Sequence, residues 1–262
     1  MMLINTVILL LRDVLPIFIL LSFLRALIIP EAFYYKNIRN VAVTCFLFIL
    51  LIIQIVEPIS EWYEGAGLEL MQVAFIVFSF SLLVIVTLLA ISGKRPNLSI
   101  RLVNIAMEAF IVIKTSNFFI FLHVYLQDKA QVFNVFIGIV LGLGICLSFS
   151  AIFYYLLKEW HDTSFKFLLY IPWFLFITGV VSQVAPLLAQ VNLLALSSPL
   201  WSTENLIENS SEYGQLLAAL VGYQSAPSKE FLVMYACVFF GVALLATLCY
   251  LLFKNRQGIS HG

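Results

Sequence analysis

Long apolar runs separated by short polar links make up the hydrophobic pattern of this chain. A helix needs about 20 mostly apolar residues to cross a bilayer, and seven runs reach or approach that length. The links between them carry most of the charged residues. The pattern therefore predicts an all-α integral membrane protein with seven transmembrane helices, at residues 5–28, 40–56, 70–91, 102–124, 132–157, 167–191 and 230–253.

The composition supports a membrane protein and argues against several other classes. Hydrophobic residues make up 63% of the 262 residues and charged residues 11%, whereas soluble domains have about half and about a quarter. The 14 basic and 14 acidic residues leave a net charge of zero, so no basic field for nucleic acid exists. The chain has no phosphate-binding glycine loop and no HExxH, GxSxG or CxxC motif, so we do not expect an enzyme.

Basic residues gather in alternate links. Because cytoplasmic links carry an excess of Lys and Arg, this distribution predicts an N-terminus outside the cell and a C-terminus in the cytoplasm. We expect a multi-pass protein of the cell membrane, most simply a bacterial inner membrane. The links after the first, third and fifth runs, with the end of the first run and the C-terminal tail, contain ten of the 14 basic residues: Arg25, Lys36, Arg39, Lys94, Arg95, Arg101, Lys158, Lys166, Lys254 and Arg256.

Ionisable residues inside the apolar runs mark the candidate site. Arg12 and Asp13 lie near the middle of the first run and Lys114 near the middle of the fourth. Such residues are costly at membrane depth and point to function. Pro16 has no N–H, so the carbonyl of Arg12 loses its helical partner and the helix is locally broken. The polar residues that accompany Lys114 in the fourth run are Glu108, Thr115, Ser116 and Asn117.

These charges allow two interpretations. They form a binding site for a transported solute, or they neutralise one another in a buried structural network, since buried ions persist only when paired. The first three runs (1–91) and the next three (102–191) begin on opposite sides of the membrane. This is the layout of two inverted three-helix repeats that meet at the midplane. With 230–253 as a seventh helix, we expect 1–262 to form a single membrane domain.

Two other segments have predicted roles. The long external link 193–229 contains an apolar stretch too short to span the membrane, so we expect an interfacial or re-entrant helix that caps the outer mouth of the bundle. Gly138 and Gly142 form a GxxxG face on which another helix can pack closely. That helix belongs either to the same chain, which we favour, or to a second copy.

Acidic residues gather in the external link after the second run. Glu57, Glu61, Glu64 and Glu69 are positioned to collect cations at the outer mouth of the bundle. Topology alone also leaves acidic residues on the external side. Both interpretations stay open.

Four segments resemble the oxidase-dependent high-affinity iron permeases of fungi and bacteria. LLRDVLPIFILLSFL (10–24) looks like the first Arg-Glu-x-x-Glu helix of that family, and AFIVIKTSNFFIFL (109–122) looks like the second. GLELMQVAFIVFSF (67–80) resembles the acidic start of the third helix, and GQLLAALVGYQSAPS (214–228) resembles the segment before the seventh. The similarity runs nearly end to end and implies a seven-helix fold with a doubled three-helix repeat.

The resemblance implies uptake of ferric iron, with iron as the transported ion and no permanently bound cofactor. It also implies, besides the lipid bilayer, a periplasmic or extracellular iron-binding or oxidase protein as partner. Both motifs are degenerate here. Asp13 and Pro16 stand at the two glutamate positions of the first motif, and both glutamates of the second, which begins at Lys114, are replaced. Glu69 keeps an acidic position, while Gln72 stands where a second acid is common.

The resemblance suggests a route for iron through these residues. Cations collect at the external glutamates, pass Asp13 near the midplane, and leave by Glu108, while Arg12 and Lys114 position the carboxylates. The metal-ligand candidates are therefore Asp13, Glu57, Glu61, Glu64 and Glu69.

Two alternatives follow from the charge at the midplane. Arg12 and Lys114 outnumber Asp13, and the run from Lys114 to Asn117 supplies hydrogen-bond donors. A transporter of another solute, such as an anion, fits this charge. The second alternative is a membrane subunit that does not transport but anchors or regulates a redox or metal-handling partner.

Overall fold

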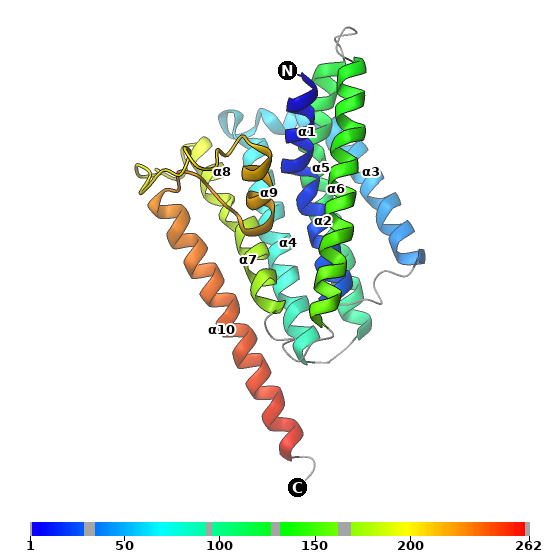
Figure 1. Cartoon of the computed structure of the whole chain (residues 1–262), viewed down its shortest axis with the longest axis vertical. Coiled ribbons are helices and arrows are strands. Elements are labelled where there is room, and N and C mark those ends of the chain that lie inside the picture. The colour runs from blue at the N-terminus through cyan, green and yellow to red at the C-terminus, as the bar shows by residue number, and fades with distance from the viewer. Residues whose placement is uncertain (1, 29–34, 93–95, 127–131, 162–168, 260–262) are drawn as a thin grey trace.

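The chain folds as an all-α protein in the computed structural model, with 85% of its residues in helices and no strand in the part that is described. The structure describes residues 2–28, 35–92, 96–126, 132–161 and 169–259. Figure 1 shows helices that run roughly along one direction, with the N-terminus and the C-terminus at opposite ends of the bundle. The described elements are α1 (Met2–Asp13), α2 (Leu15–Phe23), a π-helical turn η1 (Leu24–Ile28), α3 (Tyr35–Ser60), a 3-10 turn η3 (Trp62–Gly65), α4 (Gly67–Ser92), α5 (Pro96–Leu126), α6 (Val132–His161), α7 (Tyr170–Ser182), α8 (Val184–Gln190), α9 (Glu212–Val221) and α10 (Lys229–Ile259).

Five stretches of the described chain are long and apolar enough to cross a membrane. The other two predicted runs, 40–56 and 102–124, lie within α3 and α5, which have 26 and 31 residues. The all-helical fold is therefore confirmed, with five candidate membrane-spanning stretches in the described chain, and the count of seven crossings stays a prediction. The five stretches are Leu3–Ile28, Gly67–Ser92, Val132–Trp160, Tyr170–Gln190 and Lys229–Leu252.

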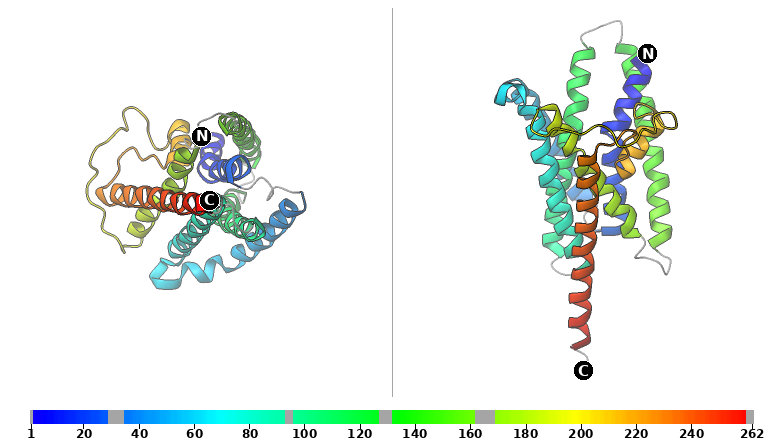
Figure 2. Two further views of the ribbon diagram at one scale, coloured as in Figure 1. Left: turned by 90° about the horizontal axis from the view of Figure 1, so that it is seen from below. Right: turned by 90° about the vertical axis from the view of Figure 1, so that its left-hand side faces the viewer.

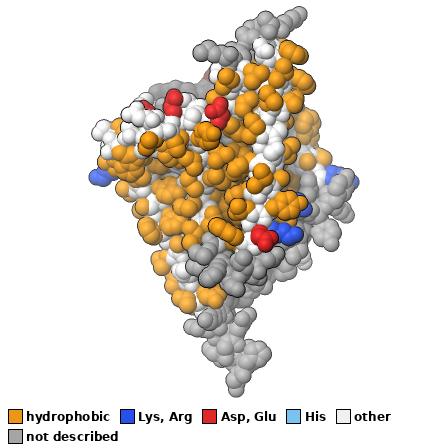
Figure 3. All heavy atoms as spheres, in the orientation of Figure 1, with side chains coloured by type: hydrophobic (Ala, Val, Ile, Leu, Met, Phe, Trp, Pro, Cys, Tyr) orange, Lys and Arg blue, Asp and Glu red, His pale blue; other side chains and the backbone are white. Residues whose placement is uncertain are grey.

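The first stretch forms the centre of the bundle. Two thirds of its most apolar window is buried, against 17% for the stretch that includes α10. A helix that is apolar all round is buried or surrounded by lipid, and α2 is buried whereas α10 is not. Side chains that point away from the core are mainly hydrophobic, and Figure 3 shows them covering most of the visible flank of the bundle. This surface suits a hydrocarbon solvent.

An aromatic cluster joins four helices below the middle of the bundle. The ring of Phe23 on α2 lies 5.1 Å from Phe153 on α6 and 5.4 Å from Trp173 on α7, centroid to centroid. Trp173 donates its indole N–H to the hydroxyl of Thr87 on α4 over 3.0 Å. A buried Trp needs such a partner because its N–H has left water. The cluster holds the lower halves of these helices together.

Two of the five long apolar stretches are interrupted within their length. The stretch Leu3–Ile28 is interrupted at Val14, between α1 and α2. The stretch Tyr170–Gln190 is interrupted at Gln183, between α7 and α8. A proline follows each break, Pro16 in α2 and Pro186 in α8, and each removes the N–H that would bond four residues back. After the first break, Ile17 donates its N–H to the carbonyl of Val14 over 3.0 Å, a tighter turn than an α-helix makes.

The predicted external link 193–229 contains the short helix α9, which lies against α1 and α7 (Figures 1 and 2). Ser211 caps its start by accepting the N–H of Gly214 over 3.0 Å. Gly222 ends it with a φ of 72°, which glycine adopts without strain. A Cβ on Gly179 of α7 would lie 2.5 Å from the nitrogen of Gly222. Only glycines allow this close approach of the two backbones.

The GxxxG face of α6 packs against α1 of the same chain. A Cβ on Gly138 would lie 2.8 Å from Cβ of Thr6, and one on Gly142 would lie 2.6 Å from a methyl group of Leu10. The glycines therefore serve packing within the chain, which is the interpretation that we favoured from the sequence.

We expect Gly138→Ala to lower the stability of the protein and Gly144→Ala to preserve or raise it. Both changes are in α6 and bring the same gain in helix propensity, about 1 kcal/mol. At Gly138 the new methyl group collides with α1, which costs about 1–3 kcal/mol in a packed interior, whereas nothing lies within 4 Å of a Cβ at Gly144. Thermal unfolding of the two variants in the same detergent measures the difference. Equal melting temperatures would contradict the α1–α6 packing.

Candidate functional site

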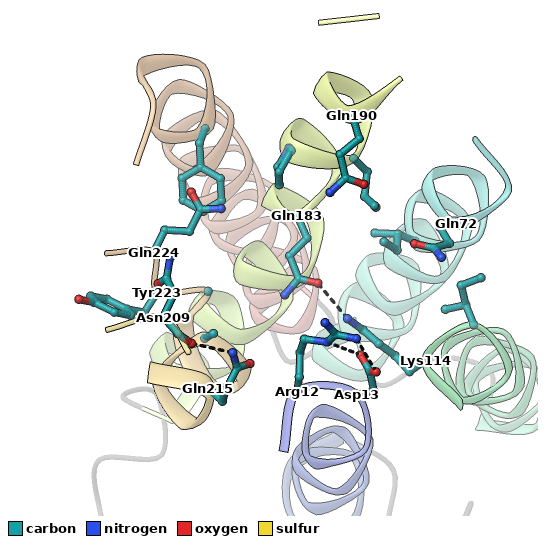
Figure 4. Close-up of a pocket in the computed structure, with 17 residues that line it drawn as sticks. Arg12, Asp13, Gln72, Lys114, Gln183, Gln190, Asn209, Gln215, Tyr223 and Gln224 are labelled. Atoms are coloured by element: carbon teal, nitrogen blue, oxygen red, sulfur yellow. Dashed lines mark hydrogen bonds and ion pairs between the residues drawn. The ribbon is translucent and has the colours of Figure 1, made fainter. Parts of the chain in front are cut away.

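A cavity of about 380 Å³ opens where the two interrupted stretches face each other. Its walls come from α1, α4, α5, α8, α9 and the start of α10, from Gln183 between α7 and α8, and from the segments on either side of α9 (Figure 4). Polar groups make up part of the lining, and Ile76, Ile113, Leu187 and Phe231 supply apolar wall. The polar lining combines the three predicted ions with Tyr223 and six carboxamides, those of Gln72, Gln183, Gln190, Asn209, Gln215 and Gln224.

Arg12 and Asp13 form a two-point ion pair at the end of α1. Nε and one terminal nitrogen of Arg12 donate to the two carboxylate oxygens of Asp13, each over 3.1 Å. The Asp13 side chain is 4% exposed and the Arg12 side chain 56% exposed. The charge of Asp13 is therefore satisfied by its neighbour, and the guanidinium reaches into the open part of the cavity.

Lys114 of α5 places a buried amine between the two helix breaks. The residue is 8% exposed, and its Nζ donates to Oε1 of Gln183 over 2.9 Å. Gln183 is itself the residue at which the sixth run breaks. Figure 4 shows Lys114 and the Arg12–Asp13 pair reaching toward the same space. Lys114 thus connects the break after α1 with the break before α8.

The charge balance around Lys114 is incomplete within the described part of the chain. No described carboxylate oxygen lies within 4.0 Å of its amine, and both oxygens of Asp13 already accept from Arg12. Ions at this depth are stable only with compensating partners. The carboxamides provide dipoles that both donate and accept hydrogen bonds. The described lining of the cavity therefore combines hydrogen-bond donors and acceptors with one formal positive charge in excess.

Among the predicted site residues whose side chains the structure describes, Arg12, Asp13 and Lys114 line the cavity and the others do not. Pro16 is buried in α2 just past the break. Thr115 is half-buried on α5, and Ser116 donates its hydroxyl to the carbonyl of Val112 over 2.6 Å, so it bonds to its own helix. The side chain of Asn117 lies outside the described residues.

Glu108 is on a different face of α5 from Lys114. Its Oε1 accepts the hydroxyl of Thr44 on α3 over 2.8 Å. The structure thus places Glu108 at the α3–α5 contact and away from the cavity.

The structure does not bring the external glutamates together among its described side chains. Glu61 is exposed and Glu69 half-buried, with one carboxylate oxygen of Glu69 buried without a hydrogen-bond partner. The side chains of Glu57 and Glu64 lie outside the described residues. Within the described part of the chain, no three His, Cys, Asp or Glu residues are close enough to share a metal ion. Gln72, one turn after Glu69, does line the cavity.

Sequence reasoning missed Gln183, although a signal for it was present. Asp13-Val-Leu-Pro16 and Gln183-Val-Ala-Pro186 share a pattern of one polar residue three positions before a proline inside an apolar run. In both, the proline breaks the helix and the polar side chain faces the cavity. The pattern predicts a polar site at a break and applies to both stretches.

Comparison with known proteins finds no family model, no curated protein and no solved structure that matches the chain. The likeness to the iron permeases therefore stays a prediction from the sequence. The functional argument below rests on the geometry of the cavity.

We expect Gln183→Leu to destabilise the protein by about 1–3 kcal/mol, because it leaves the buried amine of Lys114 without its acceptor. Gln190→Leu at the exposed rim of the same cavity is the matched control, with an expected change within about 0.5 kcal/mol. Chemical unfolding in detergent gives both values.

A double-mutant cycle isolates the Lys114–Gln183 interaction. Once Lys114→Met has removed the amine, the cost of Gln183→Leu should largely disappear. If the loss of unfolding free energy in the double variant equals the sum of the losses in the two single variants, the two side chains do not interact in the folded protein.

Proposed function

We propose that the protein is a membrane permease whose solute site is the cavity around Arg12, Asp13 and Lys114. The observation that supports this most is the meeting of two interrupted helices at one polar cavity. Transporters commonly bind their solutes near the bilayer midplane between broken helices, where free backbone groups and polar side chains are tolerated. An apolar flank and an interior lined by ions fit that arrangement.

The proposal includes seven crossings in two inverted repeats, with the N-terminus outside and the C-terminus in the cytoplasm of a bacterial cell. The alternation of basic links supports this orientation. The helical runs at α3 and α5 would supply the two crossings beyond the five long apolar stretches. The described chain ends lie at opposite ends of the bundle, as an odd number of crossings requires.

Solute would enter the cavity from the end of the bundle where the chain begins. Arg12 is more than half exposed and Gln190 is exposed at the rim. Asn209 and α9 line this part of the cavity, so they are positioned to control access. Gly179 and Gly222 hold α9 at this place.

Iron is the solute that the sequence resemblance suggests. An iron ion bound here would compete with Arg12 for Asp13, since both carboxylate oxygens accept hydrogen bonds from the guanidinium. The predicted exit through Glu108 would also need a path around α5, because Glu108 faces Thr44. A periplasmic iron-binding or oxidase partner would then deliver the ion.

The test is accumulation of radiolabelled ferrous and ferric iron in uptake-deficient cells with matched membrane expression. If iron is the solute, Asp13→Ala abolishes uptake, because it removes the one carboxylate among the described residues that line the cavity. Glu108→Gln keeps uptake close to wild type, since the amide still accepts from Thr44. Loss of uptake in Glu108→Gln would support the route through Glu108.

Uptake at the level of empty vector by the wild type would exclude iron as the solute under these conditions. The permease proposal itself is tested by a panel of labelled ions and small polar solutes in proteoliposomes. If none crosses, and a stable partner co-purifies equally with Asp13→Ala and Lys114→Gln, the chain is a membrane anchor for that partner and the proposal is wrong.

A further inference from the structure

We infer that the cavity binds a small organic anion with one negative charge, such as a monocarboxylate, with Lys114 as its counter-ion. The inference rests on the proposed function, since it names the class of solute for the same cavity. It differs from the iron hypothesis in the sign of the bound charge.

Among the described residues of the cavity, one positive group has no carboxylate in contact with it. Arg12 and Asp13 neutralise each other through two hydrogen bonds. The amine of Lys114 contacts the neutral Gln183, and no described carboxylate oxygen lies within 4.0 Å of it. A buried charge is stabilised by an opposite charge in contact with it. A carboxylate bound in the cavity would supply that charge.

The free hydrogen-bonding capacity beside Lys114 consists of donors. An ammonium has three N–H bonds and gives one to Gln183. Because Oε1 of Gln183 faces Lys114, the NH2 group of the same amide is left for the cavity. Arg12 has five N–H bonds and uses two on Asp13. These three residues therefore offer N–H groups to the same space, whereas the oxygens of Asp13 are occupied.

The size and the apolar wall favour an organic ion over a bare inorganic one. The volume of about 380 Å³ lies in the range of small-molecule sites and corresponds to on the order of ten water-sized groups. Ile76, Ile113, Leu187 and Phe231 provide a surface for a carbon skeleton. A carboxylate head at Lys114 with a short apolar body against these side chains fits both halves of the lining.

The experiment compares three probes of similar shape on the purified full-length protein: benzoate, the neutral benzamide and the cationic benzylamine. Binding is measured by calorimetry and by the rise in melting temperature. We expect benzoate to bind at least about tenfold more tightly than benzamide, since about 1.4 kcal/mol of extra interaction corresponds to tenfold. We expect benzylamine to bind more weakly than either.

Four variants assign the effect to the cavity. Lys114→Gln should weaken benzoate binding at least about tenfold while leaving benzamide binding unchanged, and Lys114→Arg should retain most of the affinity. Asp13→Asn frees Arg12 and should tighten benzoate binding. Lys158→Gln removes one exposed positive charge from α6, outside the cavity, and should have no effect.

The outcomes separate this inference from the proposed function. If benzamide or benzylamine binds as tightly as benzoate, the inference of an anion site is wrong, but the proposed solute site stands. Benzoate binding that Lys114→Gln does not change, or that Asp13→Asn abolishes, would also overturn it. If none of the three probes binds to folded protein, the anion inference is wrong, whereas the proposed solute cavity is decided separately by the transport panel in proteoliposomes. Should Lys114→Gln fail to fold, Lys114→Arg and Asp13→Asn still decide the question.

Discussion

The buried amine of Lys114 is the constraint on which the rest of the site depends. A positive charge at this depth needs polar partners, and the fold supplies them by interrupting two membrane-crossing stretches beside it. Asp13, paired with Arg12, ends α1 at one interruption, and Gln183 lies at the other. The helix breaks and the amine are therefore parts of one arrangement, because each break alone would expose backbone groups to hydrocarbon.

The surrounding bundle makes that arrangement possible. Phe23 and Trp173 fasten the lower halves of the interrupted stretches to their neighbours, so the upper halves can separate around a cavity without loss of the core. The glycine contact between α7 and the end of α9 closes one side of the cavity. Polar chemistry is thus confined to the upper half of a bundle whose outer surface is apolar, as Figure 3 shows for one face.

The helices and the meeting of Arg12, Asp13 and Lys114 were predictable from the sequence alone. The length of each apolar run indicates a helix, and the free-energy cost of burying unpaired ions indicates that the three ions lie together. The position of Glu108 was predictable only in part: six residues before Lys114 is about 1.7 helical turns, so the two side chains point to different faces. The place of α9 was not predictable, since it depends on the contact of two glycines, Gly179 and Gly222, far apart in the chain. The role of Gln183 also required knowing which helix faces Lys114.

The most direct test asks whether Lys114 faces a cavity that solutes can reach. Lys114→Cys is treated in sealed vesicles with a membrane-impermeant thiol reagent from each side, with Gln215→Cys on α9 as the positive control. The native chain, with its four cysteines, gives the background. The account predicts labelling of Lys114→Cys above background from the same side as Gln215→Cys. Labelling of Gln215→Cys alone would contradict it and show that Lys114 belongs to a sealed structural network.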